Sequence, residues 1–355
     1  MRTGRMLALA AVGPLVASVI MLLVVAGCPQ ETATFGAGAG ATAAASGAAD
    51  TATEDGSGGS GDATEPPSAP ATGDMGTLIV DALDNAENRY FDVYELPGEQ
   101  SLMTYQAADE GLSLAPGLYR ITQYFNAAFH YADGVQIIAG QTTTVTLGAI
   151  KLVTLDGATG EYFDIWDPTG QTNYASYNAP NVLITAPAGT FVLREYFNAS
   201  FDYATNVVVT EGEVTTVEMG AIRLVTVEDA GYGEYAIWSE DGGSVYAAYK
   251  SPNELVTAPP GVFTLKQYFN PAFTYASDVV VQAGEVTTVT MGAIRYNGTM
   301  DYDIYLDGDL VRSYNVAGTT VTVPPGTYLL TKYFDDETVI ATHVVVTAGA
   351  VTEVP

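Results

Sequence analysis

A twelve-residue segment rich in aromatic side chains occurs three times in the sequence at a constant spacing. It reads YFNAAFHYADGV at 124–135, YFNASFDYATNV at 196–207 and YFNPAFTYASDV at 268–279, so each step is 72 residues. A fourth copy contains the related segment PPGTYLLTKYF at 324–334 and is seven residues shorter, the residues being lost before Tyr314. Self-similarity at a fixed period indicates a repeated structural unit. The predicted copies are 76–149, 150–221, 222–293 and 294–355.

Each copy has the pattern of a small all-β unit. The third copy offers seven short runs rich in β-branched and aromatic residues, separated by turn signals such as SEDGG, APPG and QAGE. Gly and Pro supply turn dihedrals that other residues resist. Many short strands with regular turn signals are typical of a β-sandwich. The expected fold class is therefore all-β, with four tandem small β-sandwich repeats after a signal peptide and a disordered linker.

A family resemblance supports the same fold. The segment PPGTYLLTKYF, the later VVVTAGAVTEV and the turn YLDGD in the fourth copy resemble PEGA and carboxypeptidase-regulatory-like modules. The first three copies depart from that pattern with longer turns, YELPGEQ, WDPTGQT and WSEDGGS. The resemblance covers residues 76–355 and implies transthyretin-like sandwiches of bacterial surfaces. Such modules usually serve as spacers, interaction modules or accessory domains.

The N-terminus predicts export and a lipid anchor. Arg2 and Arg5 precede an apolar run that ends at Ala26, as in a secretory signal. VAGC at 25–28 resembles a bacterial lipobox, and Cys28 is the only cysteine of the chain. The resemblance implies a signal peptide over 1–27, lipidation of Cys28, and an extracytoplasmic lipoprotein of the outer membrane, periplasm or cell surface. The alternative is an uncleaved anchor, because the apolar run is about long enough to cross a bilayer.

The next segment and the overall charge limit the partners. Residues 28–75 are rich in Ala, Gly, Thr, Ser and acids, a composition that predicts a disordered low-complexity tether. The 41 acids and 12 bases give a formal charge of −29, which repels nucleic acid. The expected membrane contact is therefore the lipid at Cys28.

The period of two along a strand sorts the repeated aromatic residues by face. In the strand ending in YF, the Phe is expected in the core and the Tyr outside. Phe129 is replaced by a threonine in the fourth copy, which places its column near a rim, whereas Ile in place of Tyr131 indicates a core column. On the earlier strand, one aromatic residue per copy shares a face with the residue two positions before it, which is an aspartate in three copies and Ala236 in the third. The aspartates suggest that this face meets water.

These outward aromatic residues form the candidate ligand-binding set. Aromatic faces can stack on sugar rings, and neighbouring Asp or Asn side chains can bind hydroxyls. The alternative is that they cover a sandwich edge or fill the contact between copies, because aromatic residues bury large areas. The candidate residues are Tyr94, Trp166, Trp238, Tyr305, Tyr124, Tyr196, Tyr268 and Tyr333.

No combination of residues indicates catalysis, a metal or a cofactor. His130 and His343 fall in columns filled by other residues in the remaining copies, so neither predicts a hydrolytic triad. The acids of DYDIYLDGD lack the spacing of an EF-hand. We therefore expect a non-enzymatic, lipid-anchored structural or interaction protein with a spacer, scaffold or adhesion role. The alternative is a glycan- or cell-wall-binding module array, and a protein partner is a third option.

Overall fold

The computed structural model describes residues 74–98, 100–160 and 162–355. The predicted signal peptide, Cys28 and residues 28–73 of the predicted tether lie outside the described residues. Within the described part, no helix is long and apolar enough to cross a membrane.

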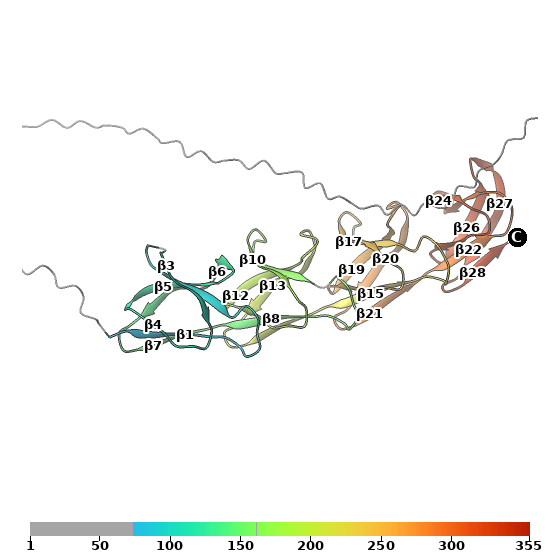
Figure 1. Ribbon diagram of the computed structural model, residues 1–355. Helices are drawn as coiled ribbons and strands as arrows, with labels where there is room; N and C mark the ends of the chain where they lie inside the picture. The colour runs from blue at the N-terminus through green and yellow to red at the C-terminus, as the bar shows by residue number, and fades with distance from the viewer. Residues whose placement is uncertain (1–73, 99, 161) are drawn as a thin grey trace, which may run out of the picture. The chain divides into compact units, whose positions relative to one another are not determined.

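The first copy forms two small sheets from seven strands (Figure 1). One sheet has three strands in the order β4-β1-β7 and the other has four in the order β3-β2-β5-β6. The strands are β1 (Gly76–Asp81), β2 (Tyr90–Glu95), β3 (Gln100–Ala107), β4 (Leu112–Leu114), β5 (Gly117–Gln123), β6 (Asn126–Ile137) and β7 (Thr142–Thr146).

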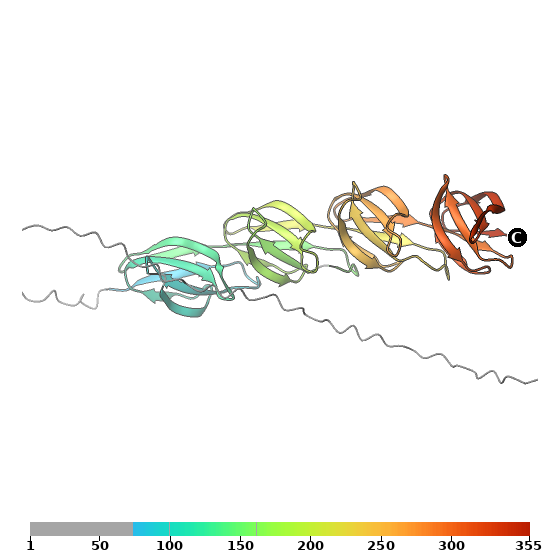
Figure 2. The same cartoon turned by 90° about the horizontal axis from the view of Figure 1, so that it is seen from above.

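The other three copies repeat this plan, and the colours of Figure 2 separate the four units. The second contains β8 (Gly148–Val153), β9 (Phe163–Trp166), β10 (Asn173–Asn178), β11 (Ile184–Ala186), β12 (Gly189–Glu195), β13 (Asp202–Val209) and β14 (Val214–Glu218). The third contains β15 (Gly220–Val225), β16 (Tyr235–Ser239), β17 (Val245–Lys250), β18 (Leu255–Ala258), β19 (Gly261–Gln267), β20 (Thr274–Val281) and β21 (Val286–Thr290). The fourth contains β22 (Gly292–Tyr296), β23 (Tyr302–Leu306), β24 (Asp309–Asn315), β25 (Thr320–Val323), β26 (Gly326–Lys332), β27 (Asp335–Val346) and β28 (Val351–Val354). The predicted all-β fold of four repeats is confirmed.

The first and last strands of every copy pair in parallel, whereas the other pairs are antiparallel. The chain therefore leaves a copy at the end opposite to the one where it entered. One residue separates the last strand of a copy from the first strand of the next. These residues, Leu147, Met219 and Met291, are at most 1% exposed.

The two sheets of each copy enclose a core made by alternating positions, as the period of two predicts. In the second copy the alternating residues Phe163 and Ile165 of β9, and Phe191 and Leu193 of the neighbouring strand β12, are all buried, and Ile165 is paired with Leu193. The inward pairs predicted for the other copies are buried as well: Phe91 and Val93, Tyr235 and Ile237, and Tyr302 and Ile304.

The prediction that the Phe of each YF pair is in the core is wrong. Phe125, Phe197, Phe269 and Phe334 are between 67% and 86% exposed. The first of these follows the end of β5 at Gln123, and the pairs in the other copies likewise follow β12, β19 and β26. Because the alternation of faces ends with the strand, the sequence pattern was extended two residues too far.

The repeated GAI motif at the start of a copy has a steric reason. A methyl group at Gly220 would overlap with the carbonyl oxygen of Gln282 and with the Val281 side chain. Gly148 and Gly292 meet the equivalent backbone in their own copies. The turn before the last strand therefore packs directly on the backbone of the first strand.

We expect Gly220→Ala to lower the free energy of unfolding by about 1–3 kcal/mol, because the rigid backbone has to move. Gly98→Ala is the control, since no atom lies within 4 Å of its added methyl, and it should stay within about 0.5 kcal/mol. Chemical denaturation of the folded protein measures both. Equal stability of the two variants would contradict the steric explanation.

Candidate functional site

The aromatic segment that recurs in the sequence lies at the boundary between consecutive copies. The ring of Phe129 stacks on Tyr174 of the second copy, with 4.7 Å between ring centroids and 4° between planes. Phe201 stacks in the same way on Tyr246 of the third copy, at 4.4 Å and 8°. Phe129, Phe201 and Phe273 are at most 3% exposed. The expected rim position of this column is wrong, because a neighbouring copy covers it.

An asparagine beside each Phe ties the two copies together through the backbone. The Nδ2 atom of Asn126 donates to the carbonyl oxygens of Asn173 and Tyr174, both at 2.9 Å. Asn198 donates to Val245 and Tyr246 in the same way, and Asn270 donates to the carbonyl oxygen of Val311 at 3.2 Å. The side chain thus satisfies backbone acceptors at an edge that would otherwise be left unpaired.

A loop between the first two strands of each copy makes the third contact. Glu87 donates its backbone N–H to the carbonyl oxygen of Leu183 at 2.7 Å and accepts from Thr185 N–H at 3.1 Å. The hydroxyl of the buried Tyr131 donates to the carbonyl oxygen of Asn88 at 2.5 Å and fixes this loop. Equivalent bridges join Thr159 to Val256 and Gly231 to Val321. Together, the Phe, the Asn and the loop bridge define the joint.

The fourth copy receives the third joint but lacks the groups with which each of the other copies contacts the copy after it. It has Asp335 in place of the asparagine, Thr338 in place of the phenylalanine and Ile340 in place of the tyrosine. The loop that bears the bridge is shortened to residues 297–301, where the third copy has 226–234. The substitutions occur together, which indicates that these columns act as one unit.

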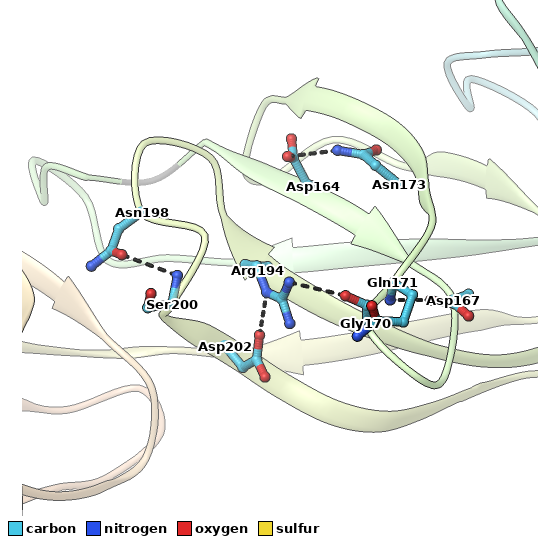
Figure 3. A network of polar contacts seen from close by, with 9 residues as sticks. All are labelled: Asp164, Asp167, Gly170, Gln171, Asn173, Arg194, Asn198, Ser200 and Asp202. Carbon is cyan, nitrogen blue, oxygen red and sulfur yellow. Dashed lines mark hydrogen bonds and ion pairs between the residues drawn. The ribbon is translucent and has the colours of Figure 1, made fainter. Parts of the chain in front are cut away.

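The predicted ligand-binding residues on the second strand of each copy are partly buried, and three of the four have side-chain partners within the chain. The guanidinium carbon of Arg194 lies 4.7 Å from the ring centroid of Trp166, and Lys266 Nζ lies 4.3 Å from that of Trp238. Arg194 also contacts Asp202 and the carbonyl oxygen of Gly170 (Figure 3). Tyr94 is partly buried as well, and the Tyr305 hydroxyl donates to Asp336 at 2.9 Å. Ligand binding by this group stays a prediction.

The second predicted group belongs to exposed chains of aromatic rings, one in each copy. Tyr105 contacts Tyr124 edge-on at 4.9 Å, and Tyr124 contacts Phe125 at 4.7 Å. The other chains are Tyr177–Tyr196–Phe197, Tyr249–Tyr268–Phe269 and Tyr314–Tyr333–Phe334. The first tyrosine of each chain was not predicted from the sequence, although it recurs in all four copies. We call these four sets the ring chains.

The first tyrosine of each ring chain has an unusual backbone conformation. Tyr105, Tyr177, Tyr249 and Tyr314 have φ between 49° and 60°, in a region that bulky residues rarely adopt. The Oδ1 atom of Asp92 accepts the N–H of Tyr105 at 2.9 Å, and Asp164 and Asp303 do the same in their copies. These carboxylates are 4–7% exposed, so the expectation that they mark a solvent-facing surface is wrong. Burial raises the pKa of Asp92 and of Asp164, against the opposing effect of these hydrogen bonds.

The histidines and the acidic cluster form no further site. His130 Nδ1 lies 2.8 Å from Asp133 Oδ2 at the surface, and His343 is exposed. Among residues 74–98, 100–160 and 162–355, no group of three or more His, Cys, Asp or Glu side chains is placed to bind a metal ion.

Three solved structures show a distant similarity to this chain. No family model matches the sequence, and no curated protein matches it significantly. The TIE protein of Bacillus anthracis is 15% identical over 61% of this chain and 50% of its own, with a TM-score of 0.15. The minor pilin GBS52 of Streptococcus agalactiae is 11% identical over 40% of this chain and 93% of its own, with the same score. The major pilin BcpA of Bacillus cereus is 10% identical over 70% and 94%, also with a score of 0.15. This chain thus spans about half the length of the TIE chain.

The joint predicts a large effect of Phe201→Ala. We expect this change to lower the free energy of unfolding by about 3–5 kcal/mol, because a buried ring is lost and a cavity remains. Thr338→Ala, in the same column of the fourth copy, is exposed and should change it by less than about 0.5 kcal/mol. Thermal unfolding followed by calorimetry compares the two. A loss at Thr338 as large as that at Phe201 would contradict the assignment of this column to the joint.

The buried Asp92 predicts a specific pH dependence. Since its pKa is raised in the folded state, the folded protein takes up this proton at higher pH than the unfolded chain does. The stability of the native protein relative to Asp92→Asn should therefore rise as pH falls from 7 to about 4, and level off below that. The Asn oxygen still accepts the Tyr105 N–H, so the contact is retained. Denaturant titrations at several pH values measure the difference, and a decrease toward acid would contradict the prediction.

Proposed function

We propose that this protein is a lipid-anchored, extracytoplasmic structural or interaction protein in which joined β-sandwich modules act as a spacer or scaffold. The observation that supports this proposal best is the joint. The asparagine contact and the loop bridge occur at all three boundaries between copies, and the stacked rings occur at the first two. The fourth copy lacks the side chains that make these contacts with a following copy. A spacer has to keep its two ends at a defined distance. Specific contacts between consecutive copies are therefore expected in a protein with that role.

The chemistry of the joint suits a mechanical role. At the first two boundaries it combines a buried phenylalanine stacked on a partly buried tyrosine with backbone hydrogen bonds across the boundary. Such an aromatic pair is worth about 0.5–1.5 kcal/mol beyond its buried area. Only one buried residue links the strands of consecutive copies, so the connection supplies little freedom of its own. These features support limited motion between modules, in contrast to flexible linkers that behave as random coils.

A distance measurement tests the spacer. Spin labels at Thr104→Cys and Glu337→Cys, both exposed positions in the first and fourth copies, report the distribution of distances between the two ends. Cys28→Ser in all variants removes the native thiol. We expect one narrow distribution for the native joints and a clearly broader one for the combined variant Asn126→Ala, Asn198→Ala and Asn270→Ala. Asp335→Ala is the matched control from the fourth copy and should leave the width unchanged. If the distance distribution of the native protein were as broad as that of the triple variant, the proposed spacer role would be wrong.

The anchor is tested separately. The sequence of residues 1–28 supports lipidation of Cys28, and acyl chains stabilise membrane binding by about 0.8 kcal/mol per buried methylene. We expect cells that express the protein to incorporate a labelled fatty acid into it and to retain it in the membrane fraction. Cys28→Ser should lose the label. A native protein without label would contradict the anchor and leave the spacer intact.

A further inference from the structure

Each joint borders a crevice that has an exposed phenylalanine in its wall. The crevice between the first two copies measures about 470 Å³ and includes Phe125. The crevices at the second and third joints measure about 640 Å³ each and include Phe197 and Phe269. These volumes fall in the range of small-molecule sites, roughly 300–1,000 Å³. The same aromatic position therefore borders a hollow at three successive boundaries.

The residues that line each of the three crevices have no net charge, whereas the chain as a whole is strongly acidic. The first is lined by amides and hydroxyls, among them Asn88, Gln123 and Ser176, and by no charged residue. The second contains one acid and one base, Glu195 and Lys250. The third contains two acids and two bases: Asp229, Glu234, Arg295 and Arg312.

Two other hollows of the described structure are lined by acidic residues. One is lined by Asp81, Asp84 and Asp109 and the other by Asp202, Glu240 and Asp241, and neither includes a basic residue. In a chain with 41 acids and 12 bases, acidic hollows are the expected kind. Balanced charge at all three joints therefore indicates an occupant without net charge, because a charged one would gain nothing from such walls.

The phenylalanine at each crevice is the last ring of its ring chain. Phe197 contacts Tyr196, which contacts Tyr177, and the Phe197 ring is 73% exposed. The left-handed backbone of Tyr177 carries strain, and strain of this kind tends to persist where it serves a function. The ring chain thus presents a large aromatic side chain to solvent, although burying it would be more favourable.

We propose that the three joint crevices, each with its exposed phenylalanine, are subsites for one uncharged polysaccharide. A pyranose ring offers an apolar face of C–H groups that packs on an aromatic ring, and hydroxyls that suit the amide, carboxylate and guanidinium groups of the walls. A polymer with a repeated unit can occupy several equivalent subsites at once, and linked weak sites then bind far more tightly than one. This inference concerns ligand binding and is independent of the lipid anchor.

The fourth copy supplies a matched control. Phe334 is 86% exposed and contacts Tyr333 as its counterparts contact theirs. Its copy carries none of the joint groups, and Phe334 lines none of the five described hollows. A role that needs the crevice therefore separates Phe334 from Phe125, Phe197 and Phe269.

The test is retention of the full-length protein in detergent micelles on insoluble chitin, cellulose, starch and mannan, with alginate as the anionic comparison and poly-L-proline as a peptide comparison. We expect retention on at least one uncharged polysaccharide, unchanged between 0.1 M and 0.5 M NaCl. The combined variant Phe125→Ala, Phe197→Ala and Phe269→Ala should raise the apparent Kd at least tenfold. Phe334→Ala should change it by less than twofold. All four positions are exposed, so thermal unfolding should match the native protein in both variants.

Several outcomes would overturn the proposal. They are no retention on any of the uncharged polysaccharides, retention only on alginate or on poly-L-proline, and retention that salt removes. An equal loss of binding in Phe334→Ala and in the triple variant would assign binding to exposed rings in general and not to the joint crevices. None of these outcomes affects the distance measurement that tests the spacer.

Discussion

The parallel pairing of the first and last strands within each copy determines how one copy meets the next. Because β8 and β14 run side by side in the same direction, the chain leaves the second copy at the end opposite to its entry. Only Met219 then separates β14 from β15 of the third copy. Two folded units connected so closely must touch, and the touching surfaces must bury apolar groups and pair their backbone groups. The stacked rings, the asparagine amide and the loop bridge meet these requirements together.

Much of this fold could be predicted from the sequence, because its main signals are local. Alternation along single strands placed Phe163 and Ile165 in the core, and the repeat period gave the number of copies. The same alternation wrongly predicted that Phe125 is buried, because the strand ends two residues before it. Contacts between copies were harder to predict: Phe129 looks like a rim residue from its own copy, and only the position of Tyr174 in the next copy buries it.

The candidate site also depends on contacts between residues that are distant in the sequence. Trp166 and Trp238 were predicted to face solvent, and the structure places a cation near each ring, from Arg194 and Lys266. The copies with Tyr94 and Tyr305 have threonine in the column of these cations, at Thr122 and Thr331. This pairing of residue types was present in the sequence, but it becomes visible only when strand neighbours are known. The recurrent first tyrosine of the ring chains can also be found in the sequence. Its left-handed backbone conformation cannot, because nothing in the sequence around it predicts a positive φ.

The distribution of joint groups has a consequence for how such a gene can change in length. The second and third copies each present a joint to the following copy and receive one from the preceding copy. Duplication or deletion of one internal unit by recombination would therefore leave every boundary with its asparagine contact and its loop bridge. A unit added after the fourth copy would meet Asp335 and Thr338 and would gain no such boundary. Array length in related genes should accordingly vary through the middle units, in whole multiples of the 72-residue period.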